Sequence, residues 1–511
     1  MPDALWTVLS VQLALGAFDT IYHHELTERL AWRPSQRREL ALHAFRNLAY
    51  AVLFAAIGWS RPQGAVALAL LGLMFAEVLV TLWDFVEEDR TRRLPPSERV
   101  THALLALNYG ALLFILAPLF ARWAAGPTGV AVSYHGPWSW ICGVAALGVI
   151  VSGLRDWAAS DRLSRMAQDD PAMLARALRE RRTVVVTGGT GFIGRRLVES
   201  LVAAGHGVTV LTRSPREARD MPSAARLIAS LDAVGSSERI DAIVNLAGEP
   251  ISDGLWTVGK RRRILRSRLE VTRAVGRLIR RLKTAPEVLV SGSAVGWYGL
   301  RGDDVLSESA GPSDGFSPQL CQRWERAAMA AAGPDVRLVR LRIGLVLAAE
   351  GGVLSRMLLP FELGLGGSFG SGRQWMSWIH RDDLVRLIVH AISCPHLSGH
   401  LNGTAPQPVR NADFAAGLAR ALGRPALFRI PAWLLRGVLG AMADEVLLGG
   451  QRVISARAAS SGFRFAYPEL KDALEAIIPP ARAKANRPAH VRRGTQRRLL
   501  GCRWPRGAQF R

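Results

Sequence analysis

The chain has 511 residues, a formal net charge of +23 and a hydrophobic content of 49%. This length exceeds that of one ordinary domain, and the hydrophobic content excludes a disordered chain. The four cysteines stand far apart and no Cys-x-x-Cys occurs, which argues against a zinc ribbon or a disulfide framework. The basic charge favours an anionic partner, and the apolar first third favours membrane lipid over specific nucleic acid.

Residues 1–160 contain five apolar stretches, each about as long as the 20 residues that cross a bilayer core. They predict an all-α transmembrane domain. The first stretch carries Gln12 and Asp19, and a cleaved signal peptide is the alternative for it. That alternative is disfavoured, because the flanks lack both a basic start and a cleavage motif. A soluble helical bundle is the other alternative. The predicted spans are 4–22, 40–59, 63–86, 101–121 and 138–155.

Arginines are concentrated in alternate loops of this region. The other two loops hold only Arg61 and Arg122. Basic loops are held on the cytoplasmic side. Five spans therefore place the N-terminus outside a bacterial-type inner membrane and everything beyond residue 160 in the cytoplasm. The arginines on the predicted cytoplasmic side are Arg29, Arg33, Arg37, Arg38, Arg90, Arg92, Arg93, Arg99, Arg155, Arg162 and Arg165.

Histidines and carboxylates gather at the same, cytoplasmic ends of the predicted spans. Such groups at converging helix ends can bind a transition metal, or they can pair with the neighbouring arginines. The pattern assigns no metal. Glu77, deeper in the third span, must face the bundle interior because a carboxylate in lipid is costly. The candidate metal ligands are His23, His24, His43, Asp84, Glu87 and His102.

A polar linker, residues 161–182, precedes the glycine-rich segment TVVVTGGTGFIG at 183–194. A β-branched strand runs directly into the glycines, and an amphipathic helix follows over 195–204. This context predicts a dinucleotide-binding turn in an α/β, doubly wound, Rossmann-type parallel sheet. The alternative is a structural glycine-rich turn. The predicted cofactor contacts here are Gly188, Gly189, Thr190, Gly191, Phe192, Ile193 and Gly194.

The second predicted strand, 208–212, ends without the acidic residue that would hold the ribose of NAD(H). Arg213 follows it, and Arg216 stands three residues further on. A guanidinium suits a 2′-phosphate by its charge and its paired donors. The sequence therefore predicts NADP(H) rather than NAD(H). The alternative is that Arg213 is a solvated surface residue.

Two later strands end in small or hydroxylic residues. The strand at 241–248 is predicted to pass under the cofactor, and that at 287–295 carries serines at its carboxyl end. Ligands bind at this edge of an open α/β sheet. The basic helix between them, 261–283, is most simply a solvated face. The predicted cofactor residues are Asn245, Ala247 and Gly248, and the serines are Ser291 and Ser293.

Several segments of the chain are similar to a known family. TGGTGFIG resembles the extended short-chain dehydrogenase/reductases, the nucleotide-sugar epimerase superfamily. Other segments resemble an atypical branch of that superfamily, the epimerase family proteins. The resemblance covers about residues 183–478 and implies an NAD(P)-binding Rossmann domain. The segments are NLAGEPI (245–251), SGSAVGWYG (291–299), GLGG (364–367), SWIHRDD (377–383), LNGTAPQPV (401–409), GQRV (450–453) and GFRF (462–465).

Active members of this superfamily use a Tyr-x-x-x-Lys pair, and none occurs in residues 183–478. An alignment on Glu325 puts Ser317 and Cys321 in the two places. Epimerase or dehydrogenase chemistry is therefore not carried over from the resemblance. The candidates that remain are Tyr298 as a proton donor, with Ser291 or Ser293 polarising a carbonyl. The alternative makes Tyr298 an aromatic of the pocket wall.

The last third of the chain supplies the predicted substrate part, from about residue 400. In the superfamily the region of SWIHRDD lines the substrate cleft, so His380 and Trp378 are the predicted substrate contacts. Asp382 or Asp383 is expected to cap the helix at 384–392. The final segment, 479–511, is predicted to be a disordered basic tail.

Two functions fit these observations. The first is a membrane-held NADPH-dependent oxidoreductase acting on an unidentified carbonyl, sugar or lipid-type substrate. The second is a non-catalytic NADPH-binding redox sensor or regulator. The missing Tyr-x-x-x-Lys pair favours the sensor, and the retained cleft motifs favour the enzyme. The sequence leaves the substrate and the oligomeric state open.

Overall fold

The computed structural model describes residues 3–92, 94–166, 169–215, 218 and 221–479. The chain divides into two compact units, Met1–Met166 and Ala167–Arg511, which are described separately. Arg216 and the predicted basic tail from residue 480 onward lie outside the described residues. The three cysteines that the structure describes, Cys142, Cys321 and Cys394, are free and buried.

The first unit contains five helices that are long and apolar enough to cross a membrane. A π-helical stretch, η1, continues the first helix through Glu28. At one end of the bundle, β1 (Ser60–Gln63) pairs antiparallel with β2 (Gly129–Val132). The helices are α1 (Asp3–Phe18) with η1 (Asp19–Glu28), α2 (Arg37–Trp59), α3 (Ala65–Thr91), α4 (Pro96–Ala124) and α5 (Pro137–Arg165).

Large apolar side chains of this bundle point outward as well as inward. Leu107 is 74% exposed and Phe114 83% exposed, although both lie in the middle of α4. Carboxylates, by contrast, are buried inside. Glu77 on α3 is 1% exposed and accepts hydrogen bonds from Arg46 and Tyr50. The predicted interior position of Glu77 is therefore confirmed.

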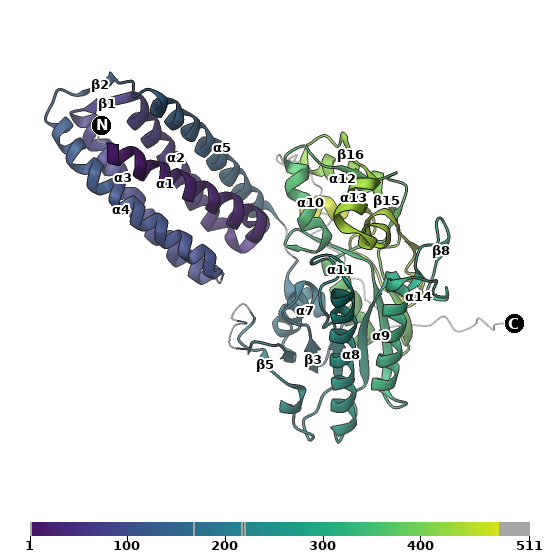
Figure 1. Cartoon of the computed structure of the whole chain (residues 1–511). Coiled ribbons are helices and arrows are strands. Elements are labelled where there is room, and N and C mark those ends of the chain that lie inside the picture. The colour runs from purple at the N-terminus through teal and green to yellow at the C-terminus, as the bar shows by residue number, and fades with distance from the viewer. Residues whose placement is uncertain (1–2, 93, 167–168, 216–217, 219–220, 480–511) are drawn as a thin grey trace, which may run out of the picture. The chain divides into compact units, whose positions relative to one another are not determined.

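The second unit is built on a parallel sheet of seven strands, which confirms the doubly wound α/β prediction (Figure 1). The chain enters at β3, adds β4 and β5 on one side, and then crosses to add the other strands on the opposite side. The direction of winding thus reverses between β3 and β6. In spatial order the strands are β14 (Gly399–Gly403), β9 (Arg337–Ile343), β7 (Val288–Ala294), β6 (Ala242–Asn245), β3 (Thr183–Thr187), β4 (Gly207–Leu211) and β5 (Arg226–Ile228).

Helices cover both faces of this sheet because its strands are apolar on both sides. Val184 and Val186 of β3 pack in the cluster that includes α7 (Phe192–Ala203) and α11 (Arg381–Ser393). Val185 points the other way and packs with α8 (Val258–Arg281) and α9 (Phe316–Ala332). This alternation is the period of two that a strand imposes.

Shorter elements outside the main sheet form the smaller part of the unit. This part contains residues from both sides of β14, which lies at the edge of the main sheet. The start of a substrate part near residue 400 stays a prediction. Its strand pairs are β10 (Leu345–Ala348) with β13 (Trp378–His380), β11 (Gly367–Phe369) with β16 (Phe428–Ile430), β12 (Trp375–Met376) with β15 (Val409–Arg410), and β8 (Val305–Leu306) with β17 (Arg452–Val453). Its main helices are α10 (Gly352–Glu362), α12 (Asn411–Leu422), α13 (Ala432–Leu439) and α15 (Leu470–Ile477).

Candidate dinucleotide site

The glycine-rich turn joins the end of β3 to the start of α7. Gly188 has a φ of +70°, a conformation that favours glycine. A Cβ on Gly194 would lie 2.2 Å from the Gly188 carbonyl oxygen, so the helix packs directly on the turn. Gly191 stands at the N-cap of α7. A helix N-terminus presents free N–H groups and a partial positive charge, which suits a pyrophosphate.

The loop after β6 lies against this turn. A Cβ on Gly188 would be 2.8 Å from the Ala247 nitrogen, so the two backbones are in contact. The Asn245 side chain is fully buried: it accepts a hydrogen bond from Thr187 at 2.7 Å and donates one to Thr272 at 3.0 Å. Asn245 therefore ties β3, β6 and α8 together. Its predicted contact with a cofactor stays a prediction.

Helix α8 holds the same loop in place from the other side. Arg268 Nη1 donates to the Glu249 carbonyl at 3.0 Å, and Ser267 Oγ accepts from the Glu249 nitrogen at 3.0 Å. Lys260 Nζ lies 2.9 Å from Glu249 Oε1. Lys260 and Arg268 are buried, and burial lowers the pKa of Arg268 to about 10. The expectation of a simply solvated basic face over 261–283 is thus wrong for Arg268, because it is buried and has a partner in the loop.

Arg213 follows β4 at the carboxyl edge of the sheet, and its side chain is exposed. The pKa of Glu249 is lowered mainly by its hydrogen bond with Lys260, with a smaller contribution from the charge of Arg213. Because β4 and β6 both pair in parallel with β3, Arg213 and the loop after β6 follow the carboxyl ends of strands at the same edge of the sheet. The position fits a contact with the ribose phosphate, and that role stays a prediction.

The three candidate catalytic side chains are buried and make internal contacts. Ser293 Oγ donates to Glu325 at 2.8 Å, and Ser291 Oγ lies 3.4 Å from Asn245 Nδ2. Tyr298 is 0% exposed; its hydroxyl donates to Asn402 Oδ1 at 2.7 Å and accepts from Arg342 at 3.0 Å. This geometry favours a structural phenol over a proton donor, and also over an aromatic in a pocket wall.

The two positions of the missing Tyr-x-x-x-Lys pair lie on one face of α9, beside the end of β7. Ser317 Oγ donates to Glu445 at 2.6 Å. Cys321 Sγ lies 3.7 Å from the Ala294 carbonyl, and burial raises the pKa of its thiol to about 11. A buried, protonated thiol supplies neither the charge nor the amine that a lysine brings to this position.

The SWIHRDD segment has an internal role that differs from the expected one. His380, not an aspartate, caps α11: its Nδ1 accepts a hydrogen bond from the Asp382 nitrogen at 3.2 Å. Asp382 instead binds Arg196 of α7 at 2.9 Å, and Asp383 accepts from the Tyr467 nitrogen at 2.9 Å. The predicted aspartate cap is therefore wrong, because both carboxylates have ion-pair or amide partners elsewhere.

The predicted substrate contacts of this segment are buried. The Trp378 side chain is 0% exposed, and its indole donates to the Gln407 carbonyl at 3.0 Å. The His380 ring lies 4.1 Å from that of Tyr467, centroid to centroid. Burial lowers the pKa of His380 to about 3, so the ring is neutral. Substrate contact by either residue stays a prediction.

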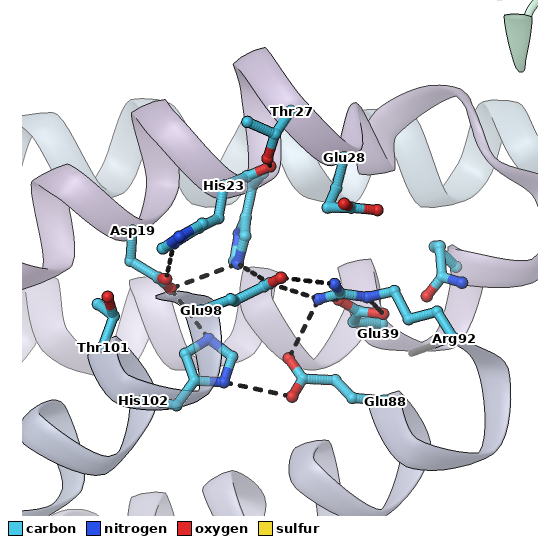
Figure 2. A network of polar contacts seen from close by, with 12 residues as sticks. Asp19, His23, Thr27, Glu28, Glu39, Glu88, Arg92, Glu98, Thr101 and His102 are labelled. Atoms are coloured by element: carbon cyan, nitrogen blue, oxygen red, sulfur yellow. Dashed lines mark hydrogen bonds and ion pairs between the residues drawn. The ribbon is translucent and has the colours of Figure 1, made fainter. Parts of the chain in front are cut away.

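In the first unit, some of the candidate metal ligands converge and others do not. His24 and His102 meet beside Asp19. His43 meets Glu39 and Glu88, while its Nε2 binds Asp84 at 3.0 Å. His23 binds the other oxygen of Asp19, at 2.9 Å (Figure 2). Glu87 stands apart, 3.9 Å from Arg38.

Several residues of these networks are absent from the sequence-based candidates. Arg342 and Asn402 complete the buried network around Tyr298 and Glu325. The signal for Arg342 is a charged residue within β9, a central strand of the sheet that reads RLVRLRI, since a buried charge requires a partner. Glu98 completes the cluster of the first unit. Its signal is the spacing Glu98–His102, which puts both side chains on one helix face.

The parallel sheet, with a glycine turn at its switch point and a second loop against that turn, defines a dinucleotide-binding protein of the Rossmann type. Residues 184–402 match the NAD dependent epimerase/dehydratase family, and residues 430–477 match a domain of unknown function, DUF1731. The chain is 42% identical over 303 residues to "Epimerase family protein SDR39U1 homolog, chloroplastic" of Arabidopsis thaliana, covering 58% of this chain and 86% of that protein. The chain therefore belongs to the NAD-dependent epimerase/dehydratase family.

A human relative, "Epimerase family protein SDR39U1", is 39% identical over 299 residues, covering 58% of this chain and 99% of the relative. The crystal structure of human epimerase family protein SDR39U1 (isoform 2) with NADPH is similar to this chain with a TM-score of 0.54 and 37% identity, again covering 58% of this chain and 99% of that one. The five-helix unit lies outside both matched family segments.

Proposed function

We propose that this protein is a membrane-anchored, NADPH-dependent oxidoreductase that acts on a carbonyl or quinone group of an unidentified substrate. The observation that carries the proposal is Arg213, which stands at the end of β4 where an NAD-specific protein has an acid. In this proposal its guanidinium pairs with the 2′-phosphate through its charge and its paired donors. The human relative whose structure holds NADPH supports the same choice of cofactor.

The polarity of the first unit supports the membrane anchor. Its outward side chains include many large apolar residues, and its buried residues include carboxylates and arginines. Exposed apolar side chains are unfavourable in water and favourable in lipid. The buried carboxylates and arginines form ion pairs with one another, as charged groups inside a membrane protein do. The proposed location is a bacterial-type inner membrane.

The arrangement of the loops supports a particular orientation. The pairing of β1 with β2 brings the two arginine-poor loops to one end of the bundle. The end of α5 contacts η1 and the residues after it: Arg155 pairs with Glu25, and Arg162 donates to the Ala31 carbonyl. The arginine-rich segments thus share an end. In our proposal this end faces the cytoplasm, together with the NADPH-binding unit.

A reductase must protonate the alkoxide that hydride transfer leaves. Because Ser317 and Cys321 replace the usual pair, we propose that Ser291 or Ser293, at the carboxyl end of β7, polarises the substrate. A modest rate is expected, because both hydroxyls are buried and already contact other side chains, Ser293 with Glu325 and Ser291 with Asn245. A quinone would not require a protein acid at this step, because the proton that its reduction requires can come from water.

A second function, a non-catalytic NADPH sensor, is favoured by one observation. The hydroxyls of Tyr298 and Ser317 both donate to acceptors of the protein itself. The two functions are separated by mixing the full chain with NADPH and a panel of carbonyl and quinone compounds. NADPH oxidation that Gly194→Ala abolishes supports the enzyme. Stoichiometric binding without oxidation of NADPH supports the sensor.

A further inference from the structure

We propose that the first unit binds one divalent transition metal ion, zinc or iron(II), through Asp19, His24 and His102. Asp19 and His24 lie on η1, and His102 lies one turn into α4. One ligand atom of each residue lies within 4.8 Å of the other two. Two imidazoles and one carboxylate are a donor set that both metals accept.

The distances between these donor atoms fit a metal ion. Asp19 Oδ2 lies 3.4 Å from His24 Nε2 and 3.3 Å from His102 Nε2. Ligands at tetrahedral angles and about 2.1 Å from a metal lie roughly 3.4 Å from one another. His24 Nε2 is buried and has no hydrogen-bond partner. The three atoms are therefore spaced as ligands, and His24 Nε2 lies near two carboxylates, that of Asp19 and, at 3.8 Å, that of Glu98.

Neighbouring groups orient the ligands as in known metal sites. His23 Nδ1 lies 2.9 Å from the second oxygen of Asp19, and Glu88 Oε2 lies 3.4 Å from His102 Nδ1 (Figure 2). A carboxylate behind a ligating imidazole fixes its tautomer and raises its basicity. Glu88 is 0% exposed, and its oxygens make only long ion-pair contacts, Oε1 with Arg92 at 3.6 Å and Oε2 with His102. A cation bound at His102 Nε2 would strengthen the hydrogen bond that Nδ1–H donates to Glu88.

The buried charge around the site also calls for a cation. Asp19, Glu39, Glu88 and Glu98 are all buried within the network of Figure 2. Arg92 is the guanidinium drawn among them; it binds Glu39 at 2.8 Å and Glu98 at 2.7 Å. Buried charges are stable only when they are paired or bound to a metal. Arg92 carries one positive charge against these four carboxylates and also lies 3.6 Å from Glu88, so a divalent ion at Asp19, His24 and His102 would offset two of the three negative charges that remain.

A cavity gives access to the proposed site. It has a volume of about 910 Å³, and Asp19, His24, His43 and His102 are part of its lining. Most of the other lining residues are apolar, among them Leu13, Val78 and Leu113. Three protein ligands with a fourth position open to a cavity are the pattern of catalytic metal sites, whereas structural sites are closed. The fourth ligand is thus water or the polar group of an apolar molecule.

The test is the metal content of the full chain in detergent, measured by mass spectrometry. The protein is stripped with a chelator, reloaded with Zn²⁺ or, without oxygen, with Fe²⁺, and passed through a desalting column. We expect about one equivalent of one of these metals. His24→Ala and His102→Ala should lower the affinity at least tenfold. His135→Ala, which changes a histidine at the β1–β2 end of the same unit, should have no effect.

Three further experiments keep the result decisive if a variant fails to fold. NADPH binding reports whether the rest of the chain is intact. Asp19→Asn replaces a ligand with a side chain of the same size. Co²⁺ added to the unaltered protein should give the intense d–d bands of a tetrahedral nitrogen and oxygen site. Retention of metal in folded His102→Ala, or the absence of both metal uptake and these bands, would show that protonated histidines balance the charge instead and would overturn the proposal.

Discussion

His380 shows how one side chain of the SWIHRDD segment stabilises the fold. Its ring caps α11 through the neutral Nδ1 atom and lies against Tyr467. A proton on Nδ1 would remove the acceptor, and burial lowers the pKa of His380 from 6.5 to about 3. The residue therefore couples the stability of the second unit to pH.

This coupling predicts a loss of stability in mild acid. The unfolded chain binds the His380 proton near pH 6.5, and the folded chain does so only near pH 3. Stability should thus fall as pH falls between these values, by about 1.4 kcal/mol per pH unit from this group. His380→Asn keeps a capping oxygen. Between pH 7 and pH 5, its free energy of unfolding should fall by about 2 kcal/mol less than that of the unaltered chain.

Denaturant unfolding of fragment 169–479 measures this difference. The fragment is expected to fold, because the human relative is 99% covered by the match to this chain and thus consists almost entirely of this unit. His396→Asn, at an exposed histidine, is the control and should behave like the unaltered fragment. An equal loss of stability in the His380 and His396 variants would disprove the coupling.

Tyr298 leads to a second prediction at this scale. Tyr298→Phe leaves Asn402 and Arg342 short of one hydrogen bond each inside the protein, which should cost about 1–3 kcal/mol of stability. Because the hydroxyl is used internally, NADPH affinity and any turnover should change less than tenfold. Calorimetry and the oxidation assay measure both quantities. A fall in turnover of about 10²-fold with unchanged stability would restore Tyr298 as the proton donor.

The β3–α7 turn is the element on which the binding of a dinucleotide depends. Gly194→Ala places a Cβ 2.2 Å from the Gly188 carbonyl oxygen, so the helix must move away from the turn. The Kd for NADPH should rise at least tenfold, which corresponds to about 1.4 kcal/mol of binding free energy. Gly207→Ala on β4 meets only ordinary contacts, the nearest at 3.6 Å from Thr183, and should bind normally. Equal NADPH affinity in the two variants, measured by fluorescence titration, would exclude this turn as the cofactor site.

The regular elements could be predicted from the sequence because hydrophobic period and glycine position determine them locally. The strand at 183–187 and the helix after the glycines are confirmed within a few residues of their predicted bounds. The partners of charged residues could not be predicted. The assignment of the α11 cap to an aspartate failed because Arg196 and the Tyr467 amide, both far away in sequence, bind those carboxylates. Local patterns contain no information about such long-range pairs.

At the scale of the whole molecule, the topology is a prediction that fusions can test. Because the arginine-rich loops lie on one side, a phosphatase fused after residue 165 should be inactive and a fluorescent protein there should be bright. A phosphatase inserted after residue 63, in an arginine-poor loop, should be active and serves as the matched control. Phosphatase activity after residue 165 would contradict an N-terminus outside and a cytoplasmic second unit.

The central claim is that the chain is an NADPH-binding protein, and calorimetry on fragment 169–479 tests it most directly. NADPH should bind at least tenfold more tightly than NADH, because Arg213 can pair with the 2′-phosphate. Arg213→Asp should reverse this preference by repelling the phosphate and accepting a hydrogen bond from the ribose hydroxyl. Equal affinity for NADPH and NADH in the unaltered fragment, or no heat of binding with either, would contradict the claim.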